Sequence, residues 1–261
     1  MYVYGRTVYV GPAPTRDHTE RMLRGFGYPV TTNGSRASLS GGGQLVATNI
    51  DVPADISSAA FFMVAGSIVP GADLLLKHVG INPTRVGIIN ILRLMGADIA
   101  LENETEAGGE PVADIRVRYA PLKGIDIPED QVPLAIDEFP VLFVAAACAE
   151  GQTRLTGAEE LRVKESDRIQ VMADGLLALG VDIKPTDDGA VIQGCGSKAQ
   201  AMSGGHVESH GDHRIAMAFV VASLRASADI SIGNCANVAT SFPNFVELAT
   251  EVGINVEEKV C

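Results

Sequence analysis

Three stretches of the chain repeat the same order of apolar and polar segments. Each begins with an aspartate that precedes an apolar helical run, at Asp55, Asp137 and Asp212. A strand-like segment follows, and then a second amphipathic helix that ends at Gly96, Gly180 or Gly253. The separations from aspartate to glycine are 41, 43 and 41 positions. The three glycines are predicted to follow the helix ends with positive φ, each leading into a short strand.

Repeats of this length indicate a modular fold in which each unit packs its apolar face on its neighbours. Because strands alternate with two helices in each unit, the sequence predicts the α/β class. Half a unit precedes the first repeat: a strand at 5–11 and a helix that ends at Phe26 and Gly27. The polar, glycine-rich segments 104–110 and 197–205 are predicted to be loops between units.

Composition narrows the functional classes. The net charge of the 261 residues is −12, which argues against nucleic acid as a partner, because phosphate backbones require a basic face. The four cysteines have neither CxxC nor metal-site spacing, so we expect them to be reduced and structural. The longest apolar run, 59–69, is too short to span a bilayer, and residues 1–10 do not form a secretion signal. The sequence therefore predicts a cytoplasmic enzyme that does not bind membranes.

The segment 160–168 carries the densest charge, and we expect it to lie at the start of a helix. Lys164, Glu165 and Arg168 are placed within one turn of each other. Helix N-termini are partially positive, so cations there cost stability unless an anion binds. The segment predicts a site for a phosphorylated or carboxylated substrate, with Glu165 placed to move a proton. The alternative is a set of ordinary surface ion pairs at helical spacing.

The segment 211–217 supports the site. Asp212 is a plausible helix N-cap, whereas a cap does not require His213 and Arg214 beside it. Arginine suits bidentate recognition of carboxylate or phosphate, and a buried structural role is the alternative for His213. Asp137 has the same place in its repeat and is either a cap or a catalytic acid or base. We expect no metal, because no Cys or clear acidic partner completes a ligand set with the histidines 206, 210 and 213.

Two further arginines precede predicted helices. Arg16 opens the first long helix and is a functional candidate, although Thr15 or Asp17 could simply cap that helix. For Arg85, a solvated position at a helix start is the favoured interpretation.

Four segments together resemble the 5-enolpyruvylshikimate-3-phosphate synthase family: RVKESDR at 162–168, GDHRIAM at 211–217, PAPTRDHTE at 12–20 and ATSFP at 239–243. The resemblance implies an enolpyruvyl transferase-like fold of repeated βαβαββ units (an inside-out α/β barrel), with the active site in a cleft between two domains. It also implies that the chain is N-terminally incomplete. Residues 1–53 would be the remnant of the first, N-terminal domain, and residues 54–261 most of the second, C-terminal domain.

The resemblance implies transfer of the enolpyruvyl (carboxyvinyl) group from phosphoenolpyruvate to shikimate 3-phosphate in aromatic amino acid biosynthesis, with release of phosphate. Asp137 matches an aspartate that contacts the shikimate hydroxyls and accepts a proton, and Glu165 matches an acid used in proton transfer at the methylene. Lys164 matches a lysine that reaches both substrates, and Arg16 matches a position that holds the shikimate phosphate in some members. Arg168 and Arg214 match arginines that hold phosphoenolpyruvate, with His213 beside them. Acid, base and cations suffice for this chemistry, so no cofactor is expected.

Two departures from the family pattern bear on activity. The family's N-terminal Lys-Ser pair and its other upstream phosphate-binding segments are missing from this sequence, and Thr240 stands where some members have a lysine. We therefore expect the N-terminal portion of the enzyme to be required as a partner. The alternatives are an inactive C-terminal fragment or subunit, and an enolpyruvyl transferase that acts on a nucleotide sugar.

Overall fold

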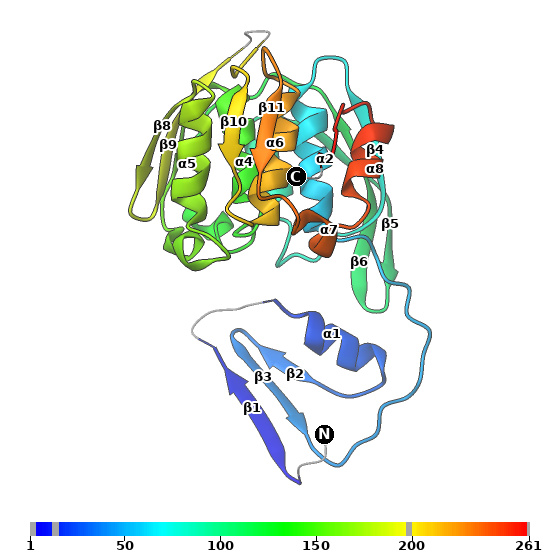
Figure 1. Ribbon diagram of the computed structural model, residues 1–261. Helices are drawn as coiled ribbons and strands as arrows, with labels where there is room; N and C mark the ends of the chain where they lie inside the picture. The colour runs from blue at the N-terminus through cyan, green and yellow to red at the C-terminus, as the bar shows by residue number, and fades with distance from the viewer. Residues whose placement is uncertain (1–3, 12–15, 197–199, 260–261) are drawn as a thin grey trace.

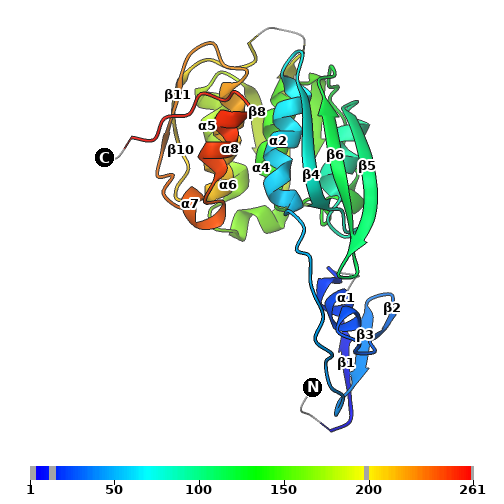
Figure 2. The same cartoon turned by 90° about the vertical axis from the view of Figure 1, so that its right-hand side faces the viewer.

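The computed structural model describes residues 4–11, 16–196 and 200–259, arranged as a small N-terminal unit and a larger body (Figure 1). The N-terminal unit contains a three-stranded antiparallel sheet of order β1-β3-β2 and one helix. Its elements are β1 (Arg6–Val10), α1 (His18–Gly25), β2 (Thr31–Asn33) and β3 (Arg36–Ser40). The segment 41–53 leads from this unit to the body (Figure 2).

Three helices pack against one another in the centre of the body: α2 (Ile56–Ile68), α4 (Phe139–Cys148) and α6 (His213–Ser223). All of α4 and nearly all of α2 are buried. This burial explains their unbroken apolar sequences, because a helix that is hydrophobic around its whole circumference belongs in a core. The strands lie outside these helices (Figures 1 and 2), so the α/β class and the inside-out arrangement are confirmed.

The outer elements of the body follow the repeats. The first sheet has the order β4-β6-β5 and the second β7-β9-β8, whereas β10 and β11 form a parallel pair. The strands are β4 (Asp73–Gly80), β5 (Asp98–Ala107), β6 (Glu110–Arg118), β7 (Glu150–Leu155), β8 (Asp182–Thr186), β9 (Gly189–Cys195), β10 (Gly205–Glu208) and β11 (Ile230–Gly233). The outer helices are α3 (Gly87–Leu94), α5 (Arg168–Ala178), α7 (Val238–Ser241) and α8 (Phe245–Glu251), with 3-10 turns η1 (Glu129–Gln131) and η2 (Glu159–Val163).

The three predicted helix ends are confirmed and share one geometry. Gly96, Gly180 and Gly253 follow α3, α5 and α8 with φ of +96°, +83° and +90°. At each end the glycine N–H and the next N–H donate to carbonyls of the last helical turn at 2.9 to 3.0 Å. This pair of bonds is a Schellman motif, which requires a left-handed residue at this position.

Two local predictions were wrong. The segment after Gly253 forms no strand within the described residues, which end at 259. The segment 104–110 is not a loop, because β5 continues to Ala107 and β6 begins at Glu110. Only Gly108 and Gly109 form the turn, and the exposed polar residues of this hairpin account for its loop-like sequence. The loop predicted at 197–205 falls partly on residues 197–199, outside the described residues.

The main hydrophobic cluster lies entirely in the body, from Ile56 to Phe245. In the N-terminal unit, α1 contains no buried residue and every residue of β1 is exposed. Several large apolar side chains of that unit are solvent-exposed: Tyr4, Val8, Tyr9, Val10 and Met22. In the part of the chain that the structure describes, no helix has the length and apolar character needed to cross a membrane.

Candidate active site

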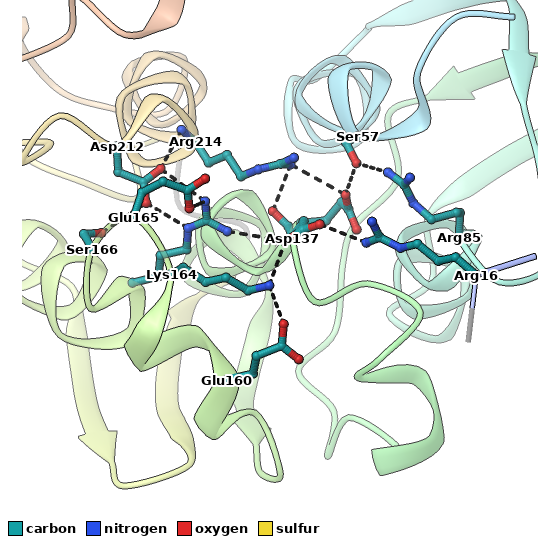
Figure 3. A network of polar contacts seen from close by, with 12 residues as sticks. Arg16, Ser57, Arg85, Asp137, Glu160, Lys164, Glu165, Ser166, Asp212 and Arg214 are labelled. Carbon is teal, nitrogen blue, oxygen red and sulfur yellow. Dashed lines mark hydrogen bonds and ion pairs between the residues drawn. The ribbon is translucent and has the colours of Figure 1, made fainter. Parts of the chain in front are cut away.

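Asp137 lies at the centre of a polar network formed at the starts of several helices (Figure 3). Its carboxylate accepts a hydrogen bond from Arg16 Nη2 at 2.9 Å, and lies 3.4 Å from Lys164 Nζ and 3.5 Å from Arg168 Nη1. Its backbone carbonyl accepts a bond from Arg214 Nη1 at 3.2 Å. Four cations from three separate segments of the chain therefore meet at one aspartate.

These cations control the ionisation of Asp137. Burial on its own would raise the pKa of this carboxyl. The hydrogen bond from Arg16 and the charges of Arg214 and Lys164 outweigh burial, and hold the pKa well below its usual value. Asp137 is therefore a carboxylate at neutral pH. It is not a helix cap, because Glu138 holds the N-cap position of α4.

Arg168 and Asp212 form a buried ion pair beside Asp137. The Arg168 side chain is 1% exposed, and its Nε donates to the fully buried Asp212 at 2.8 Å. Asp212 also accepts the backbone N–H of Arg214 at 2.9 Å, so the predicted cap of α6 is confirmed. Burial would raise the pKa of Asp212, but the Arg168 hydrogen bond and charge lower it below its usual value.

The remaining donors of Arg168 face the site. Its Nη2 donates to Glu165 at 2.5 Å, which holds a half-exposed carboxylate at the edge of the network. Its Nη1 is buried and forms no hydrogen bond within the described residues, although Asp137 Oδ1 is 3.5 Å away. A buried N–H group without a hydrogen-bond acceptor is costly, and an acceptor closer to this atom would remove that cost.

The local structure around Lys164 differs from the prediction. Lys164 does not begin a helix: it follows η2, and α5 begins at Arg168 with Asp167 as its N-cap. The Asp167 side chain accepts the Gln170 N–H at 3.0 Å, which fixes this later start. Lys164 consequently projects from a turn, where it pairs with both Asp137 and Glu160.

Of the remaining predicted residues, His213 lies beside the network, whereas Arg16 belongs to it. His213 is the first residue of α6, and burial together with the Arg214 charge lowers its pKa, which keeps the ring neutral at pH 7. Arg16 lies two residues before α1 and is partly exposed. Asp17 holds the N-cap position of α1 without a capping hydrogen bond, and Thr15 falls outside the described residues.

Sequence reasoning missed a second, buried part of the network. The Glu138 carboxylate is 1% exposed, accepts a hydrogen bond from Ser57 and lies 3.7 Å from Arg214 Nη1. Arg85, expected to be solvated, instead donates to Ser57 Oγ at 2.5 Å and is largely buried. Burial raises the pKa of Glu138 despite Ser57 and the two arginines. The available signal was the position of Glu138 directly after Asp137, before an entirely apolar helix.

The arrangement combines anion binding with acid–base groups. Its cations are already paired with carboxylates, and an incoming anion can replace those carboxylates as partners. No group of three or more potential metal ligands occurs within the described residues. The cations of the site can therefore hold the phosphate or carboxylate groups of a ligand, and its carboxylic acids can transfer protons to and from that ligand.

Comparisons with known proteins agree with this picture. A family model described as EPSP synthase (3-phosphoshikimate 1-carboxyvinyltransferase) matches residues 1–248. Proteins named 3-phosphoshikimate 1-carboxyvinyltransferase from Methylococcus capsulatus and Hydrogenovibrio crunogenus are 65% and 63% identical over 98% of the chain. The chain spans only 58% of the length of each.

Solved structures give the same result. A structure of EPSP synthase from Acinetobacter baumannii matches 97% of the chain with a TM-score of 0.95 and 62% identity, again over 58% of its own length. The enolpyruvyl transferase NikO from Streptomyces tendae matches with a TM-score of 0.75 at 19% identity, which shows a shared fold only.

Proposed function

Because the chain belongs to the EPSP synthase family, we propose that it carries part of the active site of a 3-phosphoshikimate 1-carboxyvinyltransferase. The proposed reaction transfers the enolpyruvyl group of phosphoenolpyruvate to shikimate 3-phosphate and releases phosphate. The observation that carries the proposal is the convergence of Arg16, Lys164, Arg168 and Arg214 on the Asp137 carboxylate and its carbonyl. The names of the relatives favour this acceptor over a nucleotide sugar.

The chemistry requires one proton transfer at the acceptor hydroxyl and two at the methylene carbon of phosphoenolpyruvate. The hydroxyl oxygen of the acceptor adds to the enol carbon of phosphoenolpyruvate while the methylene carbon gains a proton. The resulting adduct then loses phosphate and one proton from its new methyl group, which restores the vinyl group. We assign removal of the hydroxyl proton to Asp137 and proton transfer at the methylene to Glu165, with Lys164 placed to contact both substrates.

The cations divide between the two anionic substrates in this proposal. Arg214 and Arg168, the latter through its Nη1, bind phosphoenolpyruvate, with His213 beside them. Arg16 binds the phosphate of shikimate 3-phosphate. Each arginine can form charge-assisted, bidentate bonds to phosphate or carboxylate.

Arg16 gives Asp137 a way to become basic when substrate binds. A carboxylate whose pKa lies well below its usual value is a weak proton acceptor. When the acceptor phosphate binds Arg16, it removes the hydrogen bond that lowers this pKa most. Asp137 then becomes more basic only after the hydroxyl that it must deprotonate has arrived.

The proposal includes a requirement for a further portion of the enzyme. The chain spans 58% of its relatives' length, and the N-terminal unit exposes the apolar side chains of Val8, Tyr9, Val10 and Met22. We infer that the portion found in the relatives packs on this unit and completes the substrate site. The isolated chain would then have little or no activity.

The test is a fusion of this chain behind the upstream portion of the Methylococcus capsulatus relative. We expect the fusion to release phosphate from phosphoenolpyruvate only when shikimate 3-phosphate is added, and the 261-residue chain alone to be inactive. Asp137→Asn in the fusion should abolish turnover. Turnover with a nucleotide sugar instead would overturn the choice of acceptor, and a folded fusion without any activity would favour the inactive fragment.

A further inference from the structure

A second polar cluster joins the N-terminal unit to the body at the start of α1. Asn82, in the loop before α3, is 2% exposed. Its side-chain amide donates one hydrogen bond to Asp17 Oδ1 and another to Glu110 Oε2, both at 2.8 Å. One buried amide therefore links the residue that follows Arg16 to the first residue of β6.

The other end of the same side chain fixes its own loop. Asn82 Oδ1 accepts the backbone N–H of Thr84 at 2.8 Å and the Thr84 hydroxyl at 2.7 Å. An asparagine side chain has two N–H donors and one carbonyl oxygen with two acceptor positions, and all four are used here. A buried amide with complete hydrogen bonding has one orientation, so it can define the position of its partners.

Further contacts continue the same junction on α1. Arg21 donates to Asp17 at 2.9 Å and to the Gly109 carbonyl at 3.1 Å, and His18 Nδ1 lies 2.7 Å from Glu110 Oε1. Gly109 has φ of +86°, and an added Cβ would lie 3.3 Å from the Arg21 carbonyl. The tip of the β5–β6 hairpin thus approaches α1 directly, as Figure 2 shows.

We propose that Asn82 is a positioning residue that fixes the start of α1 on the body and so holds Arg16 against Asp137. Arg16 is the only one of the four cations at Asp137 that comes from the N-terminal unit. A partly exposed ion pair contributes little on its own. The junction at Asn82 therefore supplies the placement, and the Arg16–Asp137 contact follows from it. The relevance to catalysis rests on the function proposed above, whereas the placement itself does not.

The first test measures placement without substrate. Nitroxide labels at exposed positions 33 in β2 and 184 in β8 report the distance between the two parts by double electron–electron resonance, with the four native cysteines replaced. We expect a single narrow distribution for the parent chain. Asn82→Asp keeps the bonds to Thr84 but sets a third carboxylate against Asp17 and Glu110, so it should broaden the distribution and shift it to longer distances.

Two controls separate the junction from other causes. Thr84→Val removes a bond at the other end of the Asn82 side chain and should leave the distribution narrow. Arg16→Ala should also leave it narrow, because the contact with Asp137 is a consequence of the placement. A narrow distribution in Asn82→Asp, or a broad one in the parent chain or in Arg16→Ala, would overturn the proposal.

The second test uses the fusion enzyme. Asn82→Asp should raise the KM for shikimate 3-phosphate about tenfold, as expected for one lost charge-assisted contact, and leave the KM for phosphoenolpyruvate nearly unchanged. Equal rises in both constants would indicate general disruption and contradict a positioning role. If the proposed function is wrong, no variant turns over, and the spin-label distances still decide whether Asn82 positions Arg16.

Discussion

Two adjacent carboxylic acids, Asp137 and Glu138, have opposite environments. The pKa of Asp137 is lowered by three cations that outweigh its burial, whereas burial dominates at Glu138 and raises its pKa. Environments that separate two neighbouring acids in this way are common where acids and bases have different roles. The sequence places the two residues side by side, and the apolar helix that follows Glu138 is its one indication of which of them the core covers.

Glu138 gives a prediction on stability. Glu138→Gln keeps an acceptor for the Ser57 hydroxyl, whereas Glu138→Ala leaves Ser57 and Arg214 without this partner. We expect Glu138→Ala to lower the free energy of unfolding by about 3 kcal/mol, as for a broken buried ion pair, and Glu138→Gln to cost about 1 kcal/mol or less. Denaturant unfolding at pH 7 measures both, and equal losses would contradict a role for the hydrogen bond.

The difference in stability between the parent chain and Glu138→Gln should change with pH in a definite direction. A carboxyl whose pKa is raised in the folded protein binds its proton more tightly when folded, so its contribution is present below the usual pKa of 4.5 and is lost as the pH rises through the folded value. The parent chain should therefore lose stability relative to Glu138→Gln as the pH rises from about 4.5. A difference that does not change with pH would contradict the raised pKa.

Lys164 and Arg214 should separate turnover from binding in the fusion enzyme. Lys164→Met removes a charge placed beside Asp137, and we expect kcat to fall at least about a hundredfold. Arg214→Ala should mainly raise the KM for phosphoenolpyruvate. Lys184→Met, in β8, is the matched control and should behave like the parent enzyme. Normal turnover by Lys164→Met would contradict its place in the site.

At the level of elements, helix ends were more predictable than helix starts. Gly96, Gly180 and Gly253 each mark a helix end, because a glycine just after a helix readily adopts the positive φ of this position whatever packs around it. The start of α5 was placed too early, because charged residues 160–168 suit a helix by spacing alone, and Asp167 decides the start through one capping bond. The tip of the β5–β6 hairpin was predicted to be a loop because its polar residues are exposed. The sequence there lacks the alternation of apolar and polar residues by which a strand is recognised.

Gly180 tests the shared geometry of the helix ends. An added Cβ at Gly180 would come no closer than 3.8 Å to Ser203 Oγ, so only its φ of +83° opposes substitution. We expect Gly180→Ala to cost about 1 kcal/mol, which is the usual penalty for a left-handed L-residue. Gly205→Ala is the control, because its backbone is not left-handed and the nearest atom is 3.5 Å away. Thermal unfolding compares them, and an unaffected Gly180→Ala would contradict the argument.

At the scale of the whole molecule, the repeats indicate which helix starts hold equivalent places but not which contacts join them. The buried pair of Arg168 and Asp212 and the network at Glu138 link positions 44 to 81 residues apart. Such pairs depend on the packing of α2, α4 and α6, which a single sequence does not specify. The junction at Asn82 was missed because Glu110 was assigned to a loop and Asn82 precedes a proline in a turn-like segment.

The distribution of the core predicts that residues 54–261 fold without the N-terminal unit. The main hydrophobic cluster begins at Ile56, and the unit's described contacts with the body near Asp137 and Asn82 are polar. Lost polar contacts worth about 1 kcal/mol should lower the Tm of a domain of this size by no more than about 5 °C. Loss of cooperative melting by circular dichroism would contradict this prediction.

Removal of the N-terminal unit should also change how strongly acid lowers the stability of the body. The pKa of Asp137 is lowered in the folded chain, so its contribution to stability is fully present above the usual pKa of 3.8 and is lost progressively as the pH falls from that value toward the lowered folded pKa. Without Arg16 the pKa of Asp137 moves toward 3.8, and this contribution becomes smaller. The Tm difference between pH 7 and pH 3 should therefore be smaller for residues 54–261 than for the whole chain. Arg16→Gln in the whole chain should reproduce this change with the N-terminal unit still present, and an unchanged difference in that variant would show that Arg16 does not stabilise the Asp137 carboxylate.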